Sequence, residues 1–220
     1  MPTARLWWVG VYALAMAYLE AATVVYLRRV YGITDLLRDV MPYDARLAAI
    51  EVGREAATLV MLLAVGWAVG RSRQARLGVT LFAFGLWDVL YYGWLRALLG
   101  WPRSPLDPDI LFYIPLPWWG PVLAPLLIAT LAVVCGALLV IADGEGRAVR
   151  PRPFEWGGLA LGTLVVLYTF MADSLAALPA SAEALSRLRP GDFDWPVYLA
   201  GLAAMALSSW RALRRRAPAS

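Results

Sequence analysis

The sequence contains no histidine and no lysine, and Cys135 is its only cysteine. Without histidine, the chain cannot ligate haem or zinc through an imidazole, and it cannot form a His-box di-iron site or a Ser-His-Asp triad. A single cysteine excludes an internal disulfide or a cysteine cluster. All 20 basic residues are therefore arginines.

Charge is also scarce. Charged residues make up 16% of the chain and hydrophobic residues 61%, with a mean hydropathy of +0.61. Soluble domains are typically about 25% charged and about 45–50% apolar. This composition predicts that lipid is the main solvent. The net charge of +4 does not indicate nucleic acid as a partner, because the arginines lie at the ends of apolar segments, where membrane topology places them.

The apolar segments predict an all-α fold, a polytopic integral membrane helical bundle that forms one transmembrane domain over residues 1–220. A membrane-spanning helix needs roughly 20 mostly apolar residues. Six segments meet this requirement, although charged residues interrupt some of them. They are 6–27, 47–70, 77–99, 119–142, 155–177 and 195–211.

Arginine clusters predict the orientation of these spans, because cytoplasmic loops are enriched in basic residues. Clusters follow the second, fourth and sixth segments, which predicts cytoplasmic termini and a multi-pass protein of the cell membrane, specifically a bacterial inner membrane. Ala15-Met16-Ala17 resembles a signal-peptide cleavage site, but the apolar stretch continues to Leu27 and favours a retained helix. The clusters are Arg71, Arg73 and Arg76; Arg147, Arg150 and Arg152; and Arg211, Arg214, Arg215 and Arg216.

Two outer connections differ from simple loops. Residues 101–119 contain five prolines with interleaved aromatic side chains, which forbid a regular helix. Non-helical backbone at membrane depth requires cover from protein or water. We therefore expect this outer segment to form a lid, an interfacial plug or a short re-entrant stretch. Residues 28–46 are amphipathic and predict a short helix on the outer surface.

Ionisable residues within the spans indicate a functional site. Each costs roughly 2.5–3.5 kcal/mol at the centre of a helix, so such residues face the bundle interior and mark function by default. Four predicted helices carry carboxylates in the outer half of the bilayer. The predicted catalytic residues are Asp88, Glu51 and Glu55, and the predicted substrate-binding residues are Glu20, Arg54, Trp87, Tyr91, Tyr92 and Asp173.

Structural interpretations compete with these roles. Glu51 and Glu55 lie near a helix start, where acids favour the helix dipole and reach water. Glu20 is a candidate for a structural ion pair with Arg54. Asp173 lies close to the outer interface. Asp88 is the hardest to explain structurally, because its neighbours in the chain are apolar and aromatic.

Three functions remain open. The first is a non-redox enzyme on a lipid or isoprenoid, because a carboxylic acid in apolar surroundings stays protonated and aromatic faces stabilise cations. The cofactor is unknown, and a divalent metal on the carboxylates stays open, although no D-x-x-D signature supports it. The second is a proton- or cation-coupled transporter or channel, and the third is an accessory subunit of a membrane complex. Membrane lipids, a small lipophilic ligand, and a homo-oligomeric or complex partner are the expected partners.

Two short stretches resemble a known family. Trp87-Asp88 in a helix, followed by residues 111–115 (LFYIP), is similar to small polytopic lycopene cyclases over about thirty residues. That family has a Pro-x-Glu-Glu motif before its Phe-rich helix. The corresponding stretch here reads Asp107-Pro108-Asp109, without paired glutamates.

Overall fold

The computed structural model describes residues 2–33, 39 and 44–215. These residues are mostly helical, with six long helices, one short helix and one two-stranded hairpin. Residues 34–38 and 40–43 of the predicted amphipathic segment, and Arg216, lie outside the described residues. The elements are α1 (Pro2–Val30), α2 (Ala45–Val69), α3 (Arg73–Leu99), β1 (Pro108–Phe112), β2 (Trp118–Pro121), α4 (Leu123–Gly144), α5 (Pro153–Ala176), α6 (Ala182–Ser186) and α7 (Trp195–Arg214).

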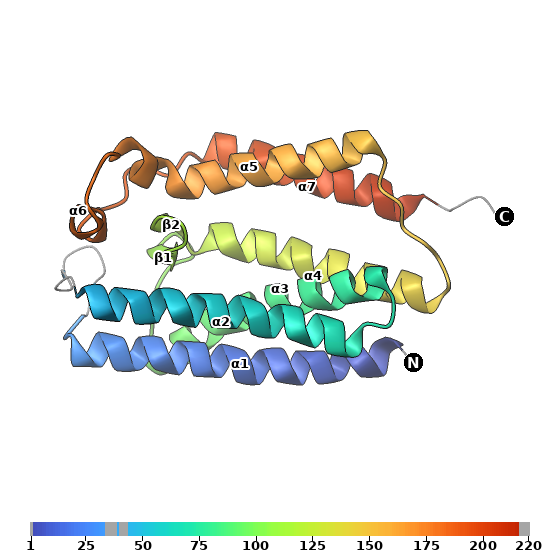
Figure 1. The fold of residues 1–220 in the computed structure, drawn as a ribbon, viewed down its shortest axis with the longest axis horizontal. Helices are drawn as coiled ribbons and strands as arrows, with labels where there is room; N and C mark the ends of the chain where they lie inside the picture. The colour runs from blue at the N-terminus through green and yellow to red at the C-terminus, as the bar shows by residue number, and fades with distance from the viewer. Residues whose placement is uncertain (1, 34–38, 40–43, 216–220) are drawn as a thin grey trace.

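The long helices lie side by side along one axis (Figure 1). Helix α3 packs against α1, α2 and α4, and α5 packs against α7. The α5–α7 pair forms one side of the molecule and α1 and α2 form the other (Figure 1). The hairpin and α6 lie at one end of the bundle, whereas the N- and C-terminal ends of the chain lie at the opposite end (Figure 1).

Four described helices are long and apolar enough to cross a membrane, namely α1 (from Ala4), α2, α4 and α5. This points to a membrane protein and agrees with the composition. Helices α3 and α7 are not in this set. Helix α3 carries Asp88, Tyr91 and Tyr92 in its central part and in the half towards the hairpin, which lowers its apolar character.

Small residues allow the central helices to approach closely. A Cβ atom added at Gly85 of α3 would lie 2.3 Å from the carbonyl oxygen of Ala129 in α4. A Cβ atom at Gly136 of α4 would lie 2.5 Å from the carbonyl oxygen of Gly78. Glycine is therefore required at Gly85 and Gly136, and small residues at such close approaches are common between membrane helices.

The hairpin is a correction to the all-α prediction. Strands β1 and β2 pair antiparallel, with Asp109 opposite Gly120 and Ile110 opposite Trp119. Residues 119–121 therefore belong to a strand, and the helix predicted from 119 begins at Leu123. The prolines forbid a helix here, as expected, but the backbone satisfies its hydrogen bonds by pairing with itself.

Candidate functional site

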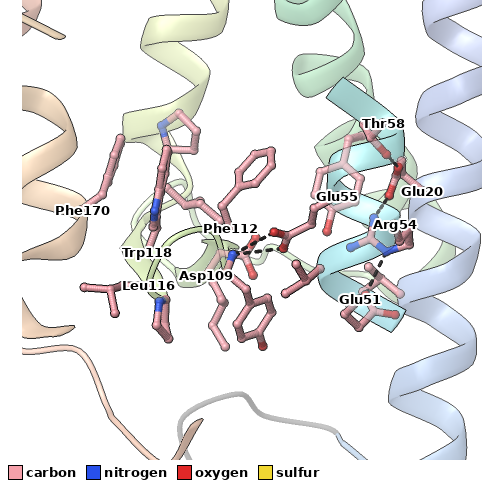
Figure 2. Close-up of a pocket in the computed structure, with 18 of the residues that line it drawn as sticks. Glu20, Glu51, Arg54, Glu55, Thr58, Asp109, Phe112, Leu116, Trp118 and Phe170 are labelled. Carbon is pink, nitrogen blue, oxygen red and sulfur yellow. Dashed lines mark hydrogen bonds and ion pairs between the residues drawn. The ribbon is translucent and has the colours of Figure 1, made fainter. Parts of the chain in front are cut away.

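A cavity of about 600 Å³ lies between α2, α3, α5 and the hairpin, at the hairpin end of the bundle. Figure 2 shows the charged residues of α1 and α2 on one side of it, the hairpin in the middle and Phe170 of α5 on the other side. Its volume is within the usual range of small-molecule sites, about 300–1,000 Å³. Eight of the nine predicted site residues line it: Glu20, Glu51, Arg54, Glu55, Trp87, Asp88, Tyr91 and Tyr92.

Arg54 is the centre of an ion network in the wall of this cavity (Figure 2). Its Nε atom donates to Glu51 at 2.8 Å, and its Nη1 atom pairs with Glu20 of the neighbouring helix. The hydroxyl of Thr58 donates to the other carboxylate oxygen of Glu20. Glu20 is buried, so the guanidinium group supplies the counter-charge that its burial requires. The carboxylates of Glu20 and Glu51 are therefore both occupied by contacts within the protein.

Glu55 fastens the hairpin to α2. Both of its carboxylate oxygens accept from the backbone N–H of Tyr113, at 3.0 and 3.1 Å. Ser174 of α5 donates to the carbonyl oxygen of Pro117 at 2.6 Å on the other side of the hairpin. The hairpin therefore connects α2 with α5 across the cavity.

Asp88 differs from the other acids of the cavity. It lines the cavity, and within the described part of the chain no side chain or backbone group hydrogen-bonds to it and no arginine pairs with it. The charged neighbour that acts on it is another acid, Asp109. A carboxyl group without a protein partner is available to a ligand.

Asp109 of β1 is a cavity residue that the sequence did not predict. It is 5% exposed and accepts a hydrogen bond from the Tyr92 hydroxyl at 3.1 Å. Burial raises the pKa of Asp109 to about 6, although Arg28 and the Tyr92 hydroxyl act in the opposite direction. Arg28 itself is buried, and its guanidinium group lies 4.3 Å from the ring centre of Trp101.

The raised pKa of Asp109 predicts a pH dependence of stability. The folded state holds this proton more tightly than the unfolded state, so the free energy of unfolding falls as pH rises between 3.8, the ordinary value, and about 6. We expect acidification from pH 7 to 4.5 to stabilise the wild type by about 2 kcal/mol relative to the Asp109→Asn variant. SDS unfolding at both pH values measures this difference. An identical pH profile for the two proteins would contradict it.

Asp173 is the predicted site residue that lies apart. It is not among the residues that line the cavity, and its carboxylate accepts from the backbone N–H of Gly191 at 3.0 Å. This contact holds the connection between α6 and α7. Asp173 lies near the hairpin end of α5, but its carboxylate contacts the α6–α7 connection and not the cavity.

Aromatic side chains form much of the cavity wall. Trp87 stacks on Tyr91 at a centroid distance of 6.3 Å, and Trp118 stacks on Phe170 at 6.3 Å. The Nε1 atoms of Trp87 and Trp118 are buried and have no hydrogen-bond partner. Leaving a buried N–H donor without an acceptor costs free energy. An oxygen atom of a ligand would supply the missing acceptor.

The acids of the cavity do not converge on one point. Among the described residues, no group of three or more His, Cys, Asp or Glu side chains is placed to hold a metal ion. The carboxylates of Glu20, Glu51 and Glu55 are instead directed at Arg54, Thr58 and a backbone N–H. The geometry therefore gives the divalent-metal hypothesis no support.

No family model, curated protein or solved structure matches this chain.

Proposed function

We propose that the chain is a membrane enzyme that performs non-redox acid–base chemistry on a lipid or isoprenoid, with Asp88 as the general acid. The observation that carries this proposal is the free Asp88 carboxyl group in a large, mostly apolar cavity. Apolar surroundings keep a carboxyl group protonated, the state in which it can act as an acid.

The charges of the cavity indicate the substrate class. Seven acidic residues line it, against three arginines within the described residues. Arg54 is held between two glutamates, and Arg28 lies over Trp101 beside Asp109. The Arg54 guanidinium group is thus committed to two carboxylates, and the Arg28 guanidinium group lies over an aromatic ring. The cavity therefore favours an uncharged or cationic amphiphile over a phosphate or diphosphate ester.

The reaction is a proton transfer that needs no cofactor. Asp88 donates its proton to a carbon–carbon double bond of the substrate and becomes a carboxylate. The resulting carbocation faces the rings of Trp87 and Tyr91, which stabilise positive charge through their π electrons. Loss of a proton from a neighbouring carbon to the Asp88 carboxylate restores the acid. The product is an isomer or a ring-closed form of the same composition.

Native mass spectrometry of the purified protein, with chromatography of the extracted ligand to separate isomers of equal mass, tests this proposal. We expect the wild type to retain an uncharged lipophilic molecule and Asp88→Asn to release it or leave it unconverted, since general acid catalysis contributes about 10²–10⁴ in rate. Asp173→Asn is the matched control, because this acid lies outside the cavity. A wild-type protein that retains no ligand would contradict the proposal. An Asp88→Asn variant that converts the ligand as fast as the wild type would also contradict it.

Cation transport is the second candidate. The excess of acids in the cavity is the observation that favours it, because buried carboxylates bind or relay cations. Flux in proteoliposomes separates the two candidates. Flux above that of empty liposomes, lost in Asp88→Asn, would favour transport over the enzyme.

We also propose six spans in the cell membrane, with α3 and α7 added to the four apolar helices and both termini in the cytoplasm. The arginine clusters support this orientation. Alkaline phosphatase fused after residue 146 or 215 should be inactive, and the same enzyme fused after residue 104 should be active. The opposite pattern would invert the topology. Homo-oligomers and complex partners remain compatible with this arrangement.

A further inference from the structure

A second, shallower groove lies at the end of the bundle opposite the cavity. It is formed by the start of α5 and the end of α7, near the C-terminal end of the chain (Figure 1). Four of its eight lining residues are arginines. The residues are Arg152, Phe154, Glu155, Leu207, Trp210, Arg211, Arg214 and Arg215.

Only one of the four arginines has a carboxylate partner within the described chain. Glu155 is fully buried, accepts from the backbone N–H of Arg152 at 2.7 Å and pairs with the Arg215 side chain. Arg211 and Arg214 are exposed and form no ion pair with the residues that the structure describes. The groove therefore has a net positive charge that the carboxylates of the described residues do not neutralise.

Aromatic rings lie beside these cations. The guanidinium group of Arg214 lies 4.1 Å from the ring centre of Trp210. Trp210 is 50% exposed and Phe154 is 55% exposed. Exposed tryptophan next to arginine is typical of the boundary between acyl chains and headgroups, where the ring contacts lipid and the cation contacts phosphate.

We propose that this groove binds the phosphate of an anionic phospholipid, with Arg211 and Arg214 as the ligating side chains and Trp210 and Phe154 against the acyl chains. Arginine suits this role because its planar group of donors matches phosphate oxygens. Basic pockets between membrane helices bind such headgroups. This site is separate from the cavity and does not depend on the function proposed for it.

The test uses the full-length protein with equimolar phosphatidylglycerol and phosphatidylcholine in mixed micelles, analysed by native mass spectrometry. We expect preferential retention of phosphatidylglycerol, reduced on the order of 20-fold in Arg211→Gln/Arg214→Gln, since each arginine near anionic lipid contributes severalfold. Both side chains are exposed, so the variant should unfold at the same SDS concentration as the wild type.

The control is Arg46→Gln/Arg103→Gln, which removes the same charge from exposed positions at the other end of the bundle. It should bind phosphatidylglycerol like the wild type. Equal loss in both double variants would mean a general charge effect and overturn the site. Equal retention of the two lipids would also overturn it, as would displacement of phosphatidylglycerol by millimolar inorganic phosphate, which would identify a free-anion site.

Discussion

Replacing Arg54 with methionine should reduce the free energy of unfolding by about 3 kcal/mol or more. The change removes the counter-charge of Glu20 and Glu51 together and leaves Glu20 buried with only the Thr58 hydroxyl as a donor. Breaking a buried ion pair from one side costs more than the pair itself contributes, because the remaining charge has no partner. SDS unfolding in mixed micelles measures the loss.

Arg46→Met is the matched control for this prediction. Arg46 is in the same helix, and its side chain is exposed and has no ion pair in the described structure. We expect a change within about 0.5 kcal/mol there. Adding Glu20→Gln to Arg54→Met should recover part of the loss, since an amide needs no counter-charge. If Arg54→Met were as stable as Arg46→Met, the ion network would not contribute to the stability of the fold.

Replacing Gly85 with leucine should force α3 and α4 apart. The first side-chain carbon would already lie 2.3 Å from the Ala129 carbonyl oxygen, and backbone on both sides cannot move away without parting the helices. We expect a loss of about 3 kcal/mol, at the upper end of overpacking effects. Circular dichroism should show that the helices remain while SDS unfolding occurs earlier.

Gly93→Leu tests the same chemical change eight residues later in α3. A Cβ atom at Gly93 meets nothing within 4 Å. Because leucine favours a helix more than glycine does, we expect this variant to be as stable as the wild type or more stable by up to about 0.8 kcal/mol. Equal destabilisation at both positions would show that the effect arises from glycine itself and not from helix packing.

The helices were predictable because lipid imposes a simple rule on sequence. A spanning segment must be long and apolar, so α1, α2, α4 and α5 follow from composition alone. The ends are less predictable, since caps such as Asp44 and Ser72 extend α2 and α3 beyond their apolar parts. The hairpin could not be predicted, because strand pairing between 108–112 and 118–121 depends on a register that proline and tryptophan content does not specify.

The site was partly predictable for the same reason. Charged residues in apolar helices stand out, and their depth brought Glu20, Arg54 and Asp88 to one cavity. Asp109 was missed because an acid in a loop is ordinarily solvated, and nothing in its local sequence indicates that Tyr92 and Arg28 enclose it. Asp173 was predicted in the same group but does not line the cavity, because depth alone does not specify the face of a helix.

The attachment of the hairpin has an evolutionary consequence. Helix α2 packs mainly on α3, and α5 packs mainly on α7 and β2. Across the cavity, α2 and α5 are joined through the contacts of Glu55 and Ser174 with one short loop, and the α5–α7 pair also packs on α4, where the Tyr198 hydroxyl donates to the Ala124 carbonyl oxygen. Insertions or deletions in that loop can resize the chamber while the interfaces of α3 with α1, α2 and α4 stay as they are. Changes in the length of this loop could therefore adapt the cavity to a larger or smaller ligand without altering the packing of these helices.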